Sequence, residues 1–258
     1  MISITNLSKE YPGGVRALVN VNLEVKKGEF VVLLGLSGSG KSTLLRCVNG
    51  LLQPTIGNVT VAGLKVNSRS KDLYKVRRRI GMIFQQFNLV KRLSVLDNVL
   101  CGRLAYCSVV HSCFRIFSAA DRELAMYALE KVGLQDKAYQ RADQLSGGQQ
   151  QRVGIARALV QQPEVLLADE PTASLDPKSS RMIMEILSRI NKEDGLTLLV
   201  SMHNVDLGLE YASRVVGLRH GRVVLDKPAN DVDRDDLEWI YDQSADSPEE
   251  ELACVKAS

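Results

Sequence analysis

The sequence lacks the features that mark membrane-spanning and nucleic-acid-binding chains. Its most apolar stretches, Phe30 to Leu36 and Leu196 to Met202, are far shorter than the roughly 18 to 20 residues that a bilayer-crossing helix needs. It has no sustained basic block, and 33 Lys and Arg residues nearly balance 30 Asp and Glu residues. We therefore expect no membrane span and no nucleic-acid partner.

A secretion signal and a disulfide framework are also absent from the pattern. The first ten residues contain no basic region followed by an apolar core, so a cytosolic location is expected. The five cysteines, an odd number without a Cys-x-x-Cys pair, suit a reducing compartment. Cys107, His111 and Cys113 form an alternative zinc-ligand set. Zinc ligands usually come in tighter, recurring pairs, so free thiols are the favoured interpretation.

What the chain does contain is enough apolar material for a large core. It has 258 residues, 45% of them hydrophobic and 24% charged. A chain of this length buries roughly 70 to 75% of its unfolded surface, so it needs no metal or disulfide staple. Short runs of Val, Ile and Leu alternate with helical patterns, which indicates an α/β fold with a parallel sheet covered on both faces. We predict one domain over residues 1–242 and an acidic, flexible tail over residues 243–258.

The apolar runs divide into two predicted sheets and a helical insert. Residues 2–7, 18–25 and 58–62 predict an N-terminal antiparallel β subdomain. The predicted core strands are residues 30–34, 80–84, 165–169 and 196–201, with a last pair at 215–218 and 223–225. From about residue 88 to residue 160 the strand signal disappears, which predicts an inserted helical subdomain. One helix there should begin at a capping box formed by Ser118 and Asp121 and end at Gly133.

A glycine-rich segment between a predicted buried strand and a predicted helix has the pattern of a phosphate-binding loop. Glycines let the backbone turn closely around phosphates, while amide groups and Lys41 supply positive charge. Ser42 is placed to ligate Mg²⁺. A plain glycine-rich turn is the structural alternative. The predicted nucleotide-binding residues of this segment are Gly35, Leu36, Ser37, Gly38, Ser39, Gly40, Lys41, Ser42 and Thr43.

Two carboxylates follow the predicted strand at residues 165–169. Ligands of open α/β sheets bind at the carboxyl ends of the strands, which is where Asp169 and Glu170 lie. We predict that Asp169 holds Mg²⁺ and that Glu170 polarises the water that attacks the γ-phosphate. Alone, such a pair would be read as a solvated edge or a helix cap; the phosphate loop upstream favours the catalytic interpretation.

The segment Leu145-Ser-Gly-Gly-Gln is a second candidate phosphate receptor. Ser146 and Gln149 fit the two ends of a capping box, and Gly147 and Gly148 would leave the positive end of the helix uncovered. An ordinary capping box explains Ser146 and Gln149. It does not explain two consecutive glycines, which cost helix stability.

These motifs, in this order, resemble those of the ATP-binding subunits of ABC transporters, over residue 1 to about residue 242. The resemblance implies a P-loop ABC ATPase fold and ATP with Mg²⁺ as ligands. It implies that Tyr11 stacks on adenine, that Gln85 senses Mg²⁺ and the membrane partner, and that His203 contacts the γ-phosphate. Glu170 and His203 are then the catalytic residues. The segment that would cross a dimer interface is Ser174, Leu175 and Asp176.

Finer features are similar to the phosphonate importers of this family. They include Asn98-Val-Leu-Cys-Gly-Arg-Leu, the run from Tyr139 into the Leu145 segment, Ala173-Ser-Leu-Asp-Pro and His203-Asn-Val-Asp-Leu. The likeness implies an ATPase that drives import of phosphonate or of the related anion phosphite. It implies a second copy of the chain, two membrane permease subunits and, indirectly, a periplasmic binding protein. The subunit would be peripheral, on the cytoplasmic face of the inner membrane.

Two other functions compete with this interpretation. A soluble ABC ATPase of DNA repair would carry a very long coiled-coil insert, and one of translation usually carries two cassettes, whereas this chain has one compact cassette. A P-loop kinase would leave Leu145 to Gln149 unexplained.

Overall fold

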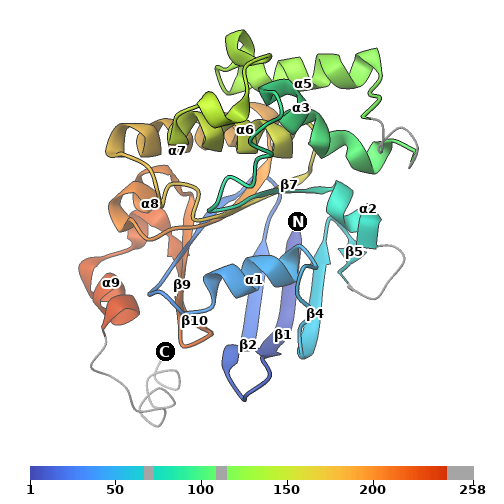
Figure 1. Cartoon of the computed structure of the whole chain (residues 1–258). Coiled ribbons are helices and arrows are strands. Elements are labelled where there is room, and N and C mark those ends of the chain that lie inside the picture. The colour runs from blue at the N-terminus through green and yellow to red at the C-terminus, as the bar shows by residue number, and fades with distance from the viewer. Residues whose placement is uncertain (67–72, 109–114, 243–258) are drawn as a thin grey trace.

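The computed structural model describes residues 1–66, 73–108 and 115–242, which form two sheets and several layers of helices (Figure 1). The central sheet has the strand order β10-β9-β3-β8-β7-β6. All neighbours in it pair parallel except β9 and β10. Its strands are β3 (Phe30–Leu34), β6 (Ile80–Ile83), β7 (Val165–Asp169), β8 (Thr197–Ser201), β9 (Arg214–Arg219) and β10 (Arg222–Pro228).

The central strands are buried on both faces, as the continuous apolar runs predict. Every residue of β3, β7 and β8 is buried. Successive side chains of a strand point to opposite faces. Phe30, Val32 and Leu34 accordingly join one core cluster, and Val31 and Leu33 join the other. The parallel core sheet predicted from the sequence is confirmed.

A second, antiparallel sheet and one helix cover one face of the central sheet. The strand order is β2-β1-β4-β5, and α1 (Lys41–Val48) lies between the two sheets (Figure 1). The predicted antiparallel strands are present, and β4 begins two residues earlier than the apolar pattern indicates. The sequence did not predict β5, whose two residues are too few for a periodic signal. The strands are β1 (Ile2–Glu10), β2 (Arg16–Val25), β4 (Ile56–Val61) and β5 (Leu64–Lys65).

Helices cover the other face of the central sheet (Figure 1). Between β6 and β7 the described residues are helical or irregular, in the region where the sequence predicts a helical insert. The capping box of Ser118 and Asp121 is present, and Gly133 has a φ of 66° just after α5. The elements of this region are α3 (Val95–Leu100), η1 (Cys101–Tyr106), α5 (Ala119–Lys131), η2 (Gln135–Lys137), η3 (Ala142–Gln144) and α6 (Gly147–Leu159).

The remaining helices connect and flank the strands of the central sheet. They are α2 (Leu73–Arg78), α7 (Pro177–Asp194), α8 (Val205–Tyr211), η4 (Ala229–Asp231) and α9 (Arg234–Tyr241). Among the described residues, no helix combines the length and the apolar character needed to cross a membrane. The predicted tail at residues 243–258, and His111 and Cys113 of the alternative zinc set, lie outside the described residues.

Candidate nucleotide-binding site

The phosphate loop connects β3 to α1 and is held tightly at both ends. A Cβ atom at Gly35, where φ is 147°, would lie 2.2 Å from the carbonyl oxygen of Leu218 on β9. A Cβ atom at Gly40, where φ is 108°, would lie 2.5 Å from the carbonyl oxygen of Ala17. No larger residue fits at either position. Between them, Gly38 has a φ of 84° and open space around it, so here the backbone conformation rather than crowding favours glycine.

Lys41 points back over this loop. Its Nζ atom donates hydrogen bonds to the carbonyl oxygens of Gly35 at 2.7 Å and Leu36 at 3.0 Å, and the residue is only 4% exposed. Burial lowers the pKa of the Lys41 ammonium, while the nearby carboxylates of Glu170 and Asp169 oppose that shift. The lysine thus lies in the loop with two carboxylates close by, a position from which an ammonium can contact phosphate oxygens.

Asp169 ends β7 beside the first turn of α1. Its Oδ1 atom accepts hydrogen bonds from Ser42 Oγ at 2.7 Å and from Ser201 Oγ at 3.0 Å. Its Oδ2 atom lies 4.0 Å from the guanidinium of Arg46. Two hydroxyls and a cation therefore fix the position of this buried carboxylate.

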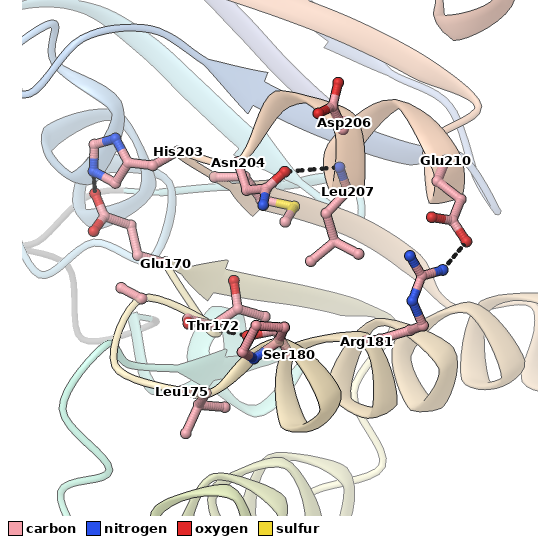
Figure 2. Close-up of a pocket in the computed structure, with 13 residues that line it drawn as sticks. Glu170, Thr172, Leu175, Ser180, Arg181, His203, Asn204, Asp206, Leu207 and Glu210 are labelled. Atoms are coloured by element: carbon pink, nitrogen blue, oxygen red, sulfur yellow. Dashed lines mark hydrogen bonds and ion pairs between the residues drawn. The ribbon is translucent and has the colours of Figure 1, made fainter.

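Glu170 follows Asp169 in an unusual backbone conformation, with a φ of 47°. Such a conformation costs of order 1 to 3 kcal/mol for a residue other than glycine. The Glu170 N–H donates to the hydroxyl and carbonyl oxygens of Ser201, which holds the turn. The turn directs the carboxylate of Glu170 toward His203, with 2.6 Å between Oε1 and Nε2 (Figure 2).

These residues converge on one cavity of about 550 Å³. Of the residues predicted from the sequence, the cavity brings together Ser37, Gly38, Gly40, Lys41, Ser42, Thr43, Gln85, Glu170 and His203. Tyr11 lies at the edge of this region, where its hydroxyl is 3.5 Å from Thr43 Oγ1. Glu170 and His203 also line a second cavity of about 520 Å³, shown in Figure 2, which contains the Arg181–Glu210 ion pair. Glu170 and His203 therefore line both cavities, whereas Arg181 and Glu210 line only the second.

The donor set suits Mg²⁺, which binds proteins through one or two carboxylates and substrate phosphates and keeps several waters. Ser42 and Asp169 place a hydroxyl and a carboxylate oxygen 2.7 Å apart at the phosphate loop, and Gln85 is exposed at the same cavity. Within the described ranges, no group of three or more His, Cys, Asp and Glu side chains is placed to hold a metal ion.

The Leu145 segment lies away from this cavity. Ser146 is exposed and caps α6 through a complete capping box with Gln149. Gly147 and Gly148 pack against the segment that follows Glu170. A Cβ atom at Gly148 would lie 2.8 Å from Ser179 Oγ. Close packing of α6 against α7 therefore explains this glycine. None of the four residues Ser146 to Gln149 is among the described residues that line the phosphate-loop cavity.

The segment from Ser174 to Asp176 connects Glu170 to α7. Ser174 is exposed, and Leu175 is the neighbour of Gly147. Asp176 caps α7 by accepting from the backbone N–H of Ser179 at 2.9 Å and from its hydroxyl at 2.6 Å. These hydrogen bonds lower the pKa of the Asp176 carboxyl.

Sequence reasoning missed Ser201 and Ser179. Ser201 is a polar residue at the carboxyl end of a buried apolar strand, and it contacts both acidic residues. That position is a recognisable signal, because ligands of parallel sheets bind at this edge. Ser179 gives no such signal, since its importance arises from the approach of α6.

The phosphate loop connects the buried strand β3 to α1, and the acidic pair stands at the end of β7, two strands away in the same sheet. This combination defines a P-loop nucleotide-binding protein. The family model for ABC transporters matches residues 18–173, and the chain belongs to that family.

Relatives of known name cover nearly the whole chain. Phosphonates import ATP-binding protein PhnC of Shouchella clausii is 52% identical over 93% of this chain and 91% of the relative. Phosphonates import ATP-binding protein PhnC 3 of a Nostoc species is 54% identical over 93% of this chain and 92% of the relative. Among solved structures, the dimeric structure of a bacterial ABC transporter cassette is 40% identical with a TM-score of 0.78, and the match covers 89% of this chain and 99% of that one.

Proposed function

We propose that this chain is the ATP-hydrolysing subunit of an ABC importer and that the imported anion is a phosphonate or the related phosphite. The observation that carries the ATPase assignment is the convergence of Lys41, Glu170 and His203 on one cavity beside Ser42 and Asp169. Two named phosphonate import proteins, 52% and 54% identical to this chain, support the choice of substrate.

Different residues of the cavity would bind ATP and catalyse its hydrolysis. The phosphate loop from Gly35 to Thr43 holds the phosphates, and Tyr11 contacts the adenine. Glu170 accepts a proton from the attacking water or polarises it. His203, hydrogen-bonded to Glu170, orients that carboxylate and contacts the γ-phosphate. Ser42, Asp169 and Gln85 would hold Mg²⁺, which neutralises charge on the phosphates when bound.

Ser146 to Gln149 would serve a nucleotide held by a second copy of the chain. Two observations support this assignment: these residues lie apart from the cavity of their own chain, and Ser146 at the positive end of α6 is exposed. A related cassette, 40% identical, forms a dimer. Ser174, Leu175 and Asp176 would then lie at the contact between the two copies.

The complete transporter would contain two copies of this chain, two membrane permease subunits and a periplasmic binding protein that delivers the anion. The chain would lie against the permeases at the cytoplasmic face of the inner membrane. Gln85, exposed at the edge of the cavity, is the residue through which the permeases and the nucleotide site would influence each other.

A titration of ATP into Lys41→Ala tests the nucleotide site. The variant should lose most of its ATP affinity, because the ammonium facing the phosphates is gone while the loop amides remain. Unchanged affinity would contradict the assignment. Circular dichroism should show a folded protein, since Lys41 contributes no apolar packing to either core cluster.

The substrate is tested with the assembled transporter in proteoliposomes. Binding protein loaded with a phosphonate or phosphite should stimulate ATP hydrolysis, and inorganic phosphate should stimulate it less. The isolated chain should bind neither anion at a site distinct from the nucleotide. Stimulation by an unrelated substrate, with none by phosphonate or phosphite, would contradict the proposed specificity.

A further inference from the structure

Two buried hydroxyl groups near the phosphate loop make no hydrogen bond of ordinary geometry to any described residue. They belong to Ser39, inside the loop, and to Tyr241, the last residue of α9. Ser39 is only 5% exposed. Burying a hydroxyl without a partner is unfavourable, so a pair of such groups at one site needs a physical explanation.

Both hydroxyls lie beside Gly35, the first residue of the loop. The Oγ atom of Ser39 is 2.7 Å from the position that a Cβ atom would take at Gly35. Burial raises the pKa of the Tyr241 hydroxyl, and a contact with the Gly35 backbone opposes that rise. A small movement of Gly35 would therefore change the surroundings of both groups.

The helix that carries Tyr241, α9, is anchored on β9, the strand that pairs with β3 before the loop. Ile240 is fully buried and packs on β9 at Gly217, where a Cβ atom would lie 2.6 Å from Ile240 Cδ1. Gly217 in turn pairs with Leu34, the residue before the loop. Arg219 stacks on the Trp239 ring at 4.8 Å and donates to its carbonyl oxygen at 3.0 Å. The anchored helix gives the Tyr241 ring a defined position.

The other end of the loop is fixed by the turn between β9 and β10. The Gly221 N–H donates to the carbonyl oxygen of Ser39 at 3.0 Å, and the Gly221 carbonyl accepts from the N–H of Val19 at 2.8 Å. The Lys227–Asp236 ion pair, at 2.8 Å, ties β10 to the start of α9. The turn and the helix thus contact the loop from one continuous C-terminal unit formed by β9, β10 and α9.

We propose that Tyr241 is a positioning residue of the phosphate loop, and that its hydroxyl and that of Ser39 gain hydrogen bonds when the loop closes on a nucleoside triphosphate. This inference rests on the proposed nucleotide-binding function. A ligand shifts a conformational equilibrium only by its differential interaction with the two states. Hydrogen bonds made only in the closed loop would therefore increase nucleotide affinity.

The test is Tyr241→Phe in the full chain, which removes one oxygen and keeps the ring. Loss of a hydrogen bond formed only in the closed state should raise the Kd and KM for ATP by about 3- to 10-fold. The kcat at saturating ATP should not change, because the reacting groups are untouched. The Tm without nucleotide should change little, because the lost hydroxyl makes no hydrogen bond of ordinary geometry in this state. Ser39→Ala should likewise raise the Kd for ATP, because it removes the second of the two hydroxyls.

Tyr211→Phe is the matched control, since Tyr211 is also partly buried against the same core cluster but lies in α8. Its ATP affinity should equal that of the unaltered chain. An unchanged Kd in Tyr241→Phe, or a fall in Tm and kcat together with affinity, would overturn the inference. Lys41→Ala distinguishes a wrong role for Tyr241 from a wrong nucleotide-binding function. If Lys41→Ala abolishes ATP binding and Tyr241→Phe leaves the Kd unchanged, only the proposed role of Tyr241 is wrong.

Discussion

His203 Nε2 lies 2.6 Å from Glu170 Oε1, although the two residues follow different strands of the central sheet. The contact exists because β7 and β8 are parallel neighbours, so that their carboxyl ends lie at the same edge of the central sheet. The Glu170 turn and the segment after β8 then point two side chains at one cavity. A carboxylate and an imidazole at this separation can share the task of orienting a water molecule.

Glu170→Gln should separate nucleotide binding from hydrolysis. The amide keeps the shape of the side chain but cannot accept a proton from water, so turnover should fall by about 10²- to 10⁴-fold while ATP affinity is retained. ATP should then trap a long-lived dimer. Turnover and elution volume measured on the same sample check both expectations.

His203→Ala should also slow turnover, because it removes the partner that orients the Glu170 carboxylate. If Glu170→Gln hydrolyses ATP at a near-normal rate, the role of base moves to another residue, with His203 the first candidate. The rate of Glu170→Gln therefore decides whether Glu170 or His203 acts on water.

The fold was largely predictable because its signals are local. Strands buried on both faces read as continuous apolar runs, and capping boxes such as Ser118 with Asp121 occupy four consecutive residues. The phosphate loop and the acidic pair are similarly compact in sequence. The antiparallel sheet beside the parallel core is confirmed for the same reason.

The contacts that organise the site were not predictable, because they depend on pairings between distant segments. Ser201 bonds to Asp169 only because β8 lies beside β7, and no pattern within either strand specifies that neighbour. Gly148 is restricted by Ser179 on another helix, and Gly35 by a carbonyl oxygen of β9. Sequence patterns identify the groups that carry chemistry better than the groups that hold them.

Gly148→Ala should damage function without destabilising α6. Alanine favours a helix over glycine by roughly 0.5 to 1 kcal/mol, but here its Cβ atom would lie 2.8 Å from Ser179 Oγ and 3.0 Å from Ser179 Cβ. Because the second atom cannot rotate away, the starts of α6 and α7 must separate. We expect ATPase activity to fall by roughly 3- to 10-fold, because the helices must shift by a few tenths of an ångström, whereas a misplacement of 1 Å can cost about 10²-fold.

A second substitution tests whether this clash is the cause. Ser179→Gly removes both crowding atoms and keeps the backbone N–H that Asp176 accepts from. Gly148→Ala combined with Ser179→Gly should recover much of the activity lost in the single variant. No recovery would assign the defect to something other than the contact between these helices.

Cys47 should be an internal reporter of the helix that follows the phosphate loop. The residue is fully buried in α1, and burial raises the pKa of its thiol to about 11. Only about one molecule in a thousand would carry the reactive thiolate at pH 8. Native protein should therefore resist alkylation at Cys47 at pH 8, react faster as the pH approaches 11, and react fully in denaturant. Peptide mass spectrometry distinguishes this site from Cys101 and Cys107; rapid native labelling at pH 8 would mean that α1 opens readily.

Mixed dimers test whether each nucleotide contacts two chains. Consider Lys41→Ala in one chain and Ser146→Arg in the other, both in a Glu170→Gln background that prevents turnover. Each variant alone should fail to dimerise on ATP, because both of its composite sites are damaged. Ser146 is an exposed N-cap, and its loss costs typically about 1 kcal/mol, so both variants should fold.

Mixing the two variants produces unequal sites. One site combines both lesions, and the other joins an intact phosphate loop to an intact Leu145 segment. A helix N-terminus contributes about half a positive charge over a short range, so Ser146 stabilises the complex only where α6 meets the γ-phosphate directly. The intact site should therefore hold tagged heterodimers together when ATP and Mg²⁺ are added, and affinity capture with two tags measures them. If Ser146 served the nucleotide of its own chain, every site in the mixture would be damaged and no heterodimer would form. Failure to capture ATP-dependent heterodimers from folded variants would support a site built within one chain.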